Sequence, residues 1–210
     1  ADNSPYYEAG VKATWTIDPK WSVQLHVLNG WQNISETNSS KAVGARVDFT
    51  PRDGLTLAYD GFIGNEQPDS QPSRLRTFNE LIVGASITDR LELRGTLDVG
   101  TQRNADGVGT GTWNGYAGLA RYRVSPHVAL AGRVEGYSDP HQFIVATSEP
   151  YGLRATGTSL GVDIAPASAL LWRAEIKWLG ARNPLFPNQH ASDELSRHDV
   201  ALVSSLALTL

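Results

Sequence analysis

Residues 170–178 read Leu-Leu-Trp-Arg-Ala-Glu-Ile-Lys-Trp, and this stretch decides the class of fold. Apolar residues stand at every second position from Leu170 to Trp178, and charged residues fill the gaps after Trp172. Because successive side chains of a β-strand point to opposite faces, this order gives one apolar face and one charged face. An amphipathic helix would instead repeat its apolar residues every three to four positions.

The same period of two recurs along the whole chain. Residues 91–99, for example, read Leu-Glu-Leu-Arg-Gly-Thr-Leu-Asp-Val. We predict 11 strands of this kind, at residues 6–17, 21–31, 41–50, 55–64, 76–87, 90–101, 113–124, 128–138, 152–164, 169–181 and 197–210. The expected fold class is all-β, with the strands arranged as an antiparallel up-and-down barrel.

Short turns and long loops alternate between these strands. The short turns, at residues 16–21, 50–55, 87–91, 124–128 and 165–169, are rich in Pro, Asp, Ser and Gly, which break a strand and favour turns. The longer polar connections lie at residues 32–40, 65–75, 101–112, 139–151 and 182–196. Short turns at one end and long loops at the other are typical of outer-membrane barrels. A soluble β-sandwich, the competing interpretation, would not usually sort its connections in this way.

Composition excludes several other classes of protein. The chain of 210 residues fits one domain, residues 1–210, and 40% of its residues are hydrophobic while 19% are charged. No apolar stretch approaches the roughly 20 residues that a membrane-spanning helix needs, so a membrane role would depend on strands. The net charge of −4, without a Lys/Arg cluster, gives no reason to expect nucleic acid, and the absence of cysteine excludes disulfides and thiolate metal sites.

Charged residues of both signs alternate with apolar ones, which suits the wall of a water-filled lumen. The side chains expected to line this lumen, here called the lumen set, are Lys12, Arg46, Asp48, Asp60, Glu80, Glu92, Arg94, Asp98, Arg121, Arg133, Glu135, Asp163, Arg173, Glu175 and Lys177. The apolar face should then contact lipid. A solvated face of a soluble sheet is the alternative reading of the same charges.

Aromatic residues near the strand ends favour the membrane interpretation, because Trp and Tyr gather where lipid meets water. On the apolar face we expect one girdle at the turn end, formed by Trp15, Trp21, Tyr122 and Trp172, and a second at the loop end, formed by Trp31, Tyr116 and Trp178. The loops 139–151 and 182–196 also contain apolar residues, so one or both are expected to fold inward or cap the mouth.

The odd number of predicted strands is informative. Strand 6–17 runs into a short turn, whereas bacterial barrels normally have an even strand count with both termini on the short-turn side. We therefore expect one or more further strands before Ala1, giving a full barrel of 12 or more strands. A closure of strand 6–17 directly on strand 197–210 would require an uncommon parallel seam.

Several motifs together resemble one known family. They are Asp18-Pro19-Lys20-Trp21-Ser22-Val23, Val27-Leu28-Asn29-Gly30-Trp31, Gly115-Tyr116-Ala117-Gly118-Leu119-Ala120-Arg121-Tyr122 and Ala131-Gly132-Arg133-Val134-Glu135-Gly136-Tyr137-Ser138-Asp139. In their order, these motifs resemble the OmpL-like β-barrel porins of the outer membrane. The resemblance implies that the chain is the C-terminal part of a larger barrel with a passive transport function. One departure is Leu210, where outer-membrane proteins usually end in an aromatic residue.

No pattern of catalytic or cofactor-binding residues stands out. The five histidines share no metal-ligand spacing, and we expect no catalytic site, metal or cofactor. The leading hypothesis is a porin-like channel of the bacterial outer membrane, not an enzyme, through which small hydrophilic solutes or ions diffuse. Its expected partners are outer-membrane lipid and these solutes, with a homo-oligomer left open. The alternatives are a plugged or partner-docked structural barrel and a lipid-face hydrolase, which would need a Ser and a His within hydrogen-bond reach. Ser196 and His198 lie near one another in the sequence, but such proximity is a common coincidence.

Overall fold

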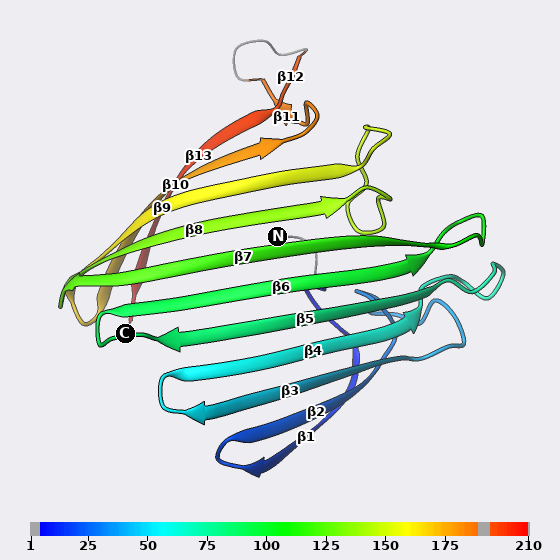
Figure 1. Ribbon diagram of the computed structural model, residues 1–210, viewed down its shortest axis with the longest axis horizontal. Coiled ribbons are helices and arrows are strands. Elements are labelled where there is room, and N and C mark those ends of the chain that lie inside the picture. Colours follow the sequence, from blue (N-terminus) through cyan, green and yellow to red (C-terminus); the bar gives the residue numbers. More distant parts are fainter. Residues whose placement is uncertain (1–4, 189–193, 210) are drawn as a thin grey trace.

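The computed structural model describes residues 5–188 and 194–209, which form a single 11-stranded antiparallel sheet and a separate pair of two-residue strands (Figure 1). The large sheet contains β1 (Gly10–Asp18), β2 (Trp21–Leu28), β3 (Ala42–Arg52), β4 (Leu55–Asn65), β5 (Leu75–Ser86), β6 (Leu91–Arg103), β7 (Thr110–Ser125), β8 (Val128–Asp139), β9 (Leu153–Ala167), β10 (Leu170–Ala181) and β13 (His198–Leu208). The short pair is β11 (Phe186–Pro187) with β12 (Leu195–Ser196). Each strand of the sheet pairs with the one before it, so the predicted all-β up-and-down fold class is confirmed.

The turns form for the local reasons that the sequence indicates. At the first turn, Oδ1 of Asp18 accepts hydrogen bonds from the backbone N–H groups of Lys20 (2.7 Å) and Trp21 (2.9 Å). At the second, Gly54 adopts a φ of 73°, which a residue without a Cβ adopts readily. All short turns lie at one end of the sheet and the longer loops at the other (Figure 1).

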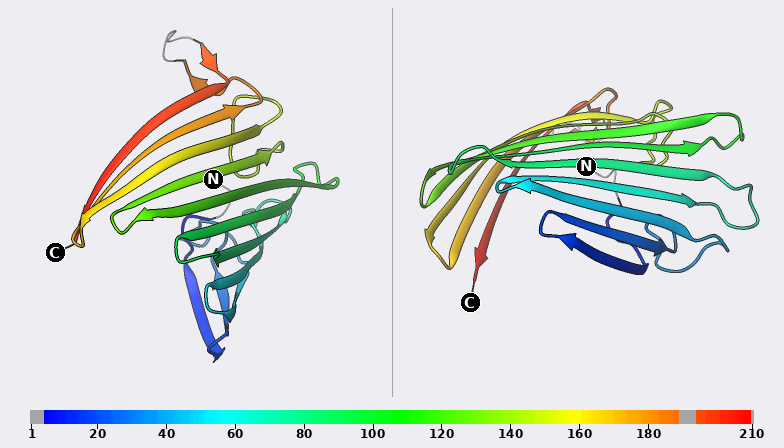
Figure 2. Two further views of the ribbon diagram at one scale, coloured as in Figure 1. Left: turned by 60° about the vertical axis from the view of Figure 1, so that its left-hand side comes forward. Right: turned by 60° about the horizontal axis from the view of Figure 1, so that its bottom comes forward.

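The sheet curves into an open trough (Figure 2). Within the described residues β1 pairs only with β2 and β13 only with β10, so the two outermost strands do not meet. Unpaired backbone groups along such edges would each cost several kcal/mol in lipid. Closure by a further strand before Ala1 stays a prediction.

Most strand boundaries shift by a few residues from those predicted, and two of these shifts have a clear structural cause. The first strand begins at Gly10 instead of residue 6, because Pro5–Glu8 turn onto the inner face and line a hollow with His26 and Asp60. The second strand ends at Leu28, and the chain that follows leaves the sheet. The described residues contain no helix that is long and apolar enough to cross a membrane.

Register sorts the side chains into two faces. In the outer row, Val47 lies opposite Tyr59 and Tyr59 opposite Leu81, and this face remains largely uncovered. Leu160 and Leu202, for instance, are 70% and 80% exposed. An apolar face of this kind is unfavourable in water and suits contact with lipid acyl chains.

Candidate functional site

The charged side chains share the other face of the sheet. Register places Arg46 opposite Asp60, Asp60 opposite Glu80 and Glu80 opposite Asp98. A second row follows β6 to β10, with Arg94 opposite Leu119, Leu119 opposite Arg133, and Ser159 between Arg133 and Lys177. By the alternation of each strand, every member of the lumen set lies on this face. Side chains two strands apart meet on this face, as Arg121 of β7 does with Asp163 of β9 at 3.3 Å, so it is the concave face of the curved sheet whose shape Figure 2 shows.

One part of this face, on β3 to β6, is mainly acidic. Arg46 forms ion pairs with Asp48 at 2.7 Å and with Asp60 at 2.6 Å. Glu80 and Asp98 lie opposite one another on the neighbouring strands. These members of the lumen set comprise one guanidinium, that of Arg46, and four carboxylates, those of Asp48, Asp60, Glu80 and Asp98. The strip that they form therefore has a negative formal charge.

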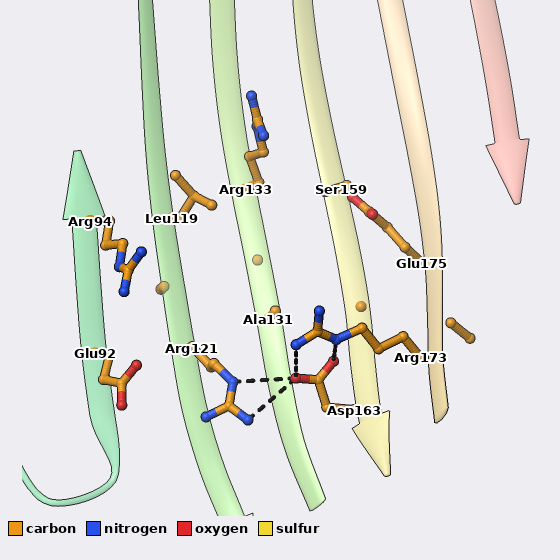
Figure 3. Close-up of a pocket in the computed structure, with 14 residues that line it drawn as sticks. Glu92, Arg94, Leu119, Arg121, Ala131, Arg133, Ser159, Asp163, Arg173 and Glu175 are labelled. Atoms are coloured by element: carbon orange, nitrogen blue, oxygen red, sulfur yellow. Dashed lines mark hydrogen bonds and ion pairs between the residues drawn. The ribbon is translucent and has the colours of Figure 1, made fainter. Parts of the chain in front are cut away.

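The part on β6 to β10 is more basic, and its carboxylates are shared. Asp163 accepts from Arg121 at 3.3 Å and from Arg173 at 3.0 Å, so one negative charge bridges two positive ones (Figure 3). Glu135 similarly forms ion pairs with Arg133 and, at 2.7 Å, with Lys177. Each of these two triads retains one formal positive charge.

Between these groups the wall is hollowed. A cavity of about 510 Å³ is lined by residues that include Arg94, Glu92 and Glu175 (Figure 3). Arg94 makes no ion pair within the described part of the chain, so no described carboxylate neutralises its charge directly. Leu119 lies on the same wall and keeps part of it apolar.

At the loop end, the concave face carries a buried aromatic cluster. It consists of Trp31, Phe62, Phe78, Trp113 and Phe143, with ring centres 5.2 to 6.1 Å apart in edge-to-face contacts. Trp113 has no exposed surface. Because Phe62 and Phe78 belong to the same row as His26, this cluster stands inside the trough and not against lipid.

An arginine is enclosed within this cluster. The guanidinium carbon of Arg76 lies 5.3 Å from the ring centre of Trp31 and 5.7 Å from that of Trp113, and the residue is only 8% exposed. Its Nε donates to Gln102 at 2.7 Å and one terminal nitrogen donates to the carbonyl of Phe143 at 3.3 Å. Arg76 thus joins the wall of the barrel to the loop after β8.

The loop after β8 is fixed by one buried carboxylate. Asp139 is completely buried and accepts hydrogen bonds from the backbone N–H groups of Phe143 (3.0 Å), Ile144 (2.8 Å) and Val145 (3.1 Å). The prediction that loop 139–151 folds inward is confirmed by these contacts and by the packing of Phe143 on Trp113. Loop 182–196 lies partly outside the described residues.

The loop after β2 corrects one prediction. Trp31 was expected in the lipid-facing girdle, but it is 6% exposed and packs inside the trough against Phe62 and Phe78. Its backbone N–H donates to both carboxylate oxygens of Glu66, at 3.0 and 3.1 Å. Burial raises the pKa of Glu66, while the nearby positive charge of Arg76 and the Trp31 hydrogen bond oppose that rise.

The Ser196 and His198 pair does not form a catalytic arrangement. Oγ of Ser196 donates to the backbone carbonyl of His198 and accepts from its backbone N–H, whereas the imidazole stacks on Trp178. The Ser196 hydroxyl is therefore bonded to the backbone of His198 and not to its imidazole. Among the described residues, no group of three or more His, Cys, Asp or Glu could hold a metal ion.

This trough, apolar outside and charged within, defines a class: the outer-membrane β-barrels of porin type. The chain belongs to the family described as "Putative beta-barrel porin-2, OmpL-like", whose model matches residues 1–209. Membership places the protein in the bacterial outer membrane and confirms the resemblance that its motifs show. A search of curated proteins found no significant match.

Solved porin structures share the fold at low sequence identity. The anion-selective porin from Comamonas acidovorans matches with a TM-score of 0.70 and 10% identity over 94% of this chain and 58% of that one. The outer membrane channel DcaP of Acinetobacter baumannii matches with a TM-score of 0.68 and 9% identity, over 93% and 61%. OmpT of Vibrio cholerae gives 0.62 and 10%, over 93% and 62%. The chain therefore spans less than two thirds of the length of these barrels.

Proposed function

We propose that the protein forms a channel for passive diffusion of small hydrophilic solutes or ions, with the lumen set as its charged lining. The observation that carries this proposal is the separation of faces: every member of the lumen set lies on the concave face, and the convex face is largely apolar. Arginine facing lipid at the midplane would cost about 2–4 kcal/mol, whereas in an aqueous lumen it stays hydrated. A lining of this kind serves hydrated solutes.

The two strips of opposite charge make the proposed lumen electrically asymmetric, with one negative and one positive side. The β3–β6 strip is negative and the β6–β10 strip has positive triads, so an anion should pass close to Arg94 and the triads. The matched porin from Comamonas acidovorans is described as anion-selective. We propose that anions are favoured here as well, because Arg94 is exposed on the basic strip and makes no ion pair within the described residues.

Single-channel recording of the full chain in planar bilayers tests this function. We expect steady ohmic steps, and a reversal potential in a salt gradient that indicates anion preference. Arg94→Gln should move that potential toward neutrality, while Arg103→Gln, at the end of β6 on the other face, should leave it unchanged. Equal shifts in the two variants would contradict the lumen assignment.

A second candidate function is a plugged structural barrel. The observation favouring it is the inward packing of Trp31 and Phe143, which fills part of the loop end of the trough. If the aromatic cluster closes the whole mouth, the wild type would show no conductance steps in the same recordings. Steps of stable amplitude would rule this candidate out.

A further inference from the structure

A polar groove interrupts the lipid-facing side of the sheet at the loop end. One row of residues crosses β7 to β13 here: Tyr116 lies opposite Gly136, Gly136 opposite Thr156, Thr156 opposite Gly180, and Gly180 opposite His198. Large rings stand at both ends of this row, with small residues between them. We call the resulting cavity of about 440 Å³ the outer groove.

The rings of Tyr116 and Trp178 lie over two glycines of this row, whose lack of a side chain makes room for them. A Cβ on Gly136 would lie 2.6 Å from Cζ of Tyr116, and one on Gly180 would lie 2.8 Å from Cζ2 of Trp178. The imidazole of His198 stacks on Trp178 with ring centres 5.5 Å apart. Tyr116 and Trp178 are 50% and 38% exposed on the lipid-facing side near the loop end. Trp and Tyr at such places typically mark the boundary between lipid and water.

Two arginines stand at the loop side of this row. Arg154, on β9, lies opposite Ser138. The backbone N–H of Arg182, one residue beyond the end of β10, donates to the carbonyl of Arg154 at 2.9 Å, so the two arginines are neighbours. Both are exposed and both line the outer groove. Like charges directly opposite one another repel, and they are tolerated best when an anion lies between them.

The counter-charge is not supplied by the surrounding wall. None of the described residues that line the outer groove is acidic, and within the described part of the chain neither Arg154 nor Arg182 forms an ion pair. The polar side chains of Ser138 and Thr156 add hydrogen-bond donors to the floor. The site therefore combines fixed positive charge, donors and flanking aromatic rings at the level of a membrane interface.

We propose that the outer groove binds the phosphate of a lipid headgroup in the outer leaflet of the membrane. Long loops are extracellular in barrels of this class, so this end of the sheet meets the outer leaflet. Arg154 and Arg182 hold the phosphate oxygens, because guanidinium groups match phosphate geometry. Tyr116 and Trp178 contact the region where the headgroup joins the acyl chains. A lipid occupant follows from the position of the outer groove on the lipid-facing side, and the inference does not depend on which solute crosses the lumen.

Native mass spectrometry of the full chain in detergent tests the proposal by titration with diphosphoryl lipid A. The variant Arg154→Gln/Arg182→Gln should bind this lipid about 10- to 100-fold more weakly, since each charge-assisted contact contributes about tenfold. The matched control Arg52→Gln/Arg90→Gln removes two exposed arginines at the turn end and should bind like the wild type. Without lipid, the groove variant should unfold at the same temperature as the wild type or higher, because a repulsion has been removed.

Three results would overturn the proposal. Equal lipid binding by the groove variant and the control would show that the arginines do not hold the headgroup. Equal binding of dephosphorylated lipid A would show that the phosphate is not recognised. Binding of inorganic phosphate with the affinity of lipid A would define a free-anion site instead.

Discussion

The carboxylate of Asp139, at the end of β8, accepts a 2.8 Å hydrogen bond from the backbone N–H of Ile144, five residues further along the chain. Similar bonds from Phe143 and Val145 make this one side chain the anchor of an inward-folded loop. Without such an acceptor, the three N–H groups would have to find water, and the loop would leave the trough. The width of the mouth is therefore expected to depend on Asp139.

Asp139→Ala should increase single-channel conductance and lower stability by about 1.5–3 kcal/mol, the typical contribution of hydrogen bonds to a charged group. Recordings in planar bilayers and urea unfolding in lipid vesicles measure the two effects. Glu149→Gln changes the charge of a residue in the same loop whose side chain makes no such bonds, and it should alter neither. An unchanged conductance in Asp139→Ala would mean that the loop does not limit the pore.

Asp163→Asn should increase anion preference, because the triad with Arg121 and Arg173 would change its formal charge from +1 to +2. Stability should fall by no more than about 1 kcal/mol, since the arginine side chains are 38% and 57% exposed and their charges are screened. Reversal potentials in a salt gradient measure the selectivity. Asp89→Asn removes the same charge from an exposed turn, and a similar shift there would contradict a local effect of the triad.

The strand pattern was readable from the sequence because period two is a local property. Alternation in residues 170–178 predicted the two faces of β10, and the turn residues placed the connections close to their observed positions. The inward position of Trp31 could not be read in this way. It depends on Phe62, Phe78 and Trp113, which lie on other strands and meet only when register is set.

The face on which Phe62 and Phe78 lie could nevertheless be predicted from the sequence. Phe62 is two residues from Asp60, and Phe78 is two residues from Glu80, so both belong to the charged face by alternation. Aromatic residues at charged-face positions near the loop end therefore signal an inner cluster. The anchoring role of Asp139 could not be predicted in this way. Its partners are backbone N–H groups of a loop, and the loop sequence has no periodicity that would indicate them.

Arg76→Met should make stability more dependent on pH. Burial already raises the pKa of Glu66, and loss of the nearby positive charge should raise it further. A carboxyl whose pKa is raised by folding favours the folded state when protonated, so stability is lost as pH rises through that folded-state pKa. The variant should therefore be destabilised more at about pH 8 than at about pH 4, by about 3 kcal/mol at the higher pH.

Urea unfolding in lipid vesicles at several pH values measures this difference. In a Glu66→Gln background the carboxyl is absent, and Arg76→Met should then cost nearly the same free energy at all pH values. A pH dependence that persists in this background would assign the effect to another group.

Gly100→Ala should disturb the aromatic cluster from the neighbouring strand β6. Gly100 lies opposite Trp113 on β7 and opposite Phe78 on β5, and the indole of Trp113 occupies the space that a Cβ at residue 100 would need. Since Trp113 is completely buried, the ring has no free direction in which to move, and such overpacking typically costs about 1–3 kcal/mol.

Gly95→Ala is the matched control on the same strand, because its Cβ would meet only the carbonyl oxygen of Ala117 at 3.8 Å. We expect the Gly100 variant to unfold at lower urea concentration and to show altered tryptophan fluorescence, and the Gly95 variant to behave like the wild type. Equal stability of the two variants would show that Trp113 does not pack over Gly100.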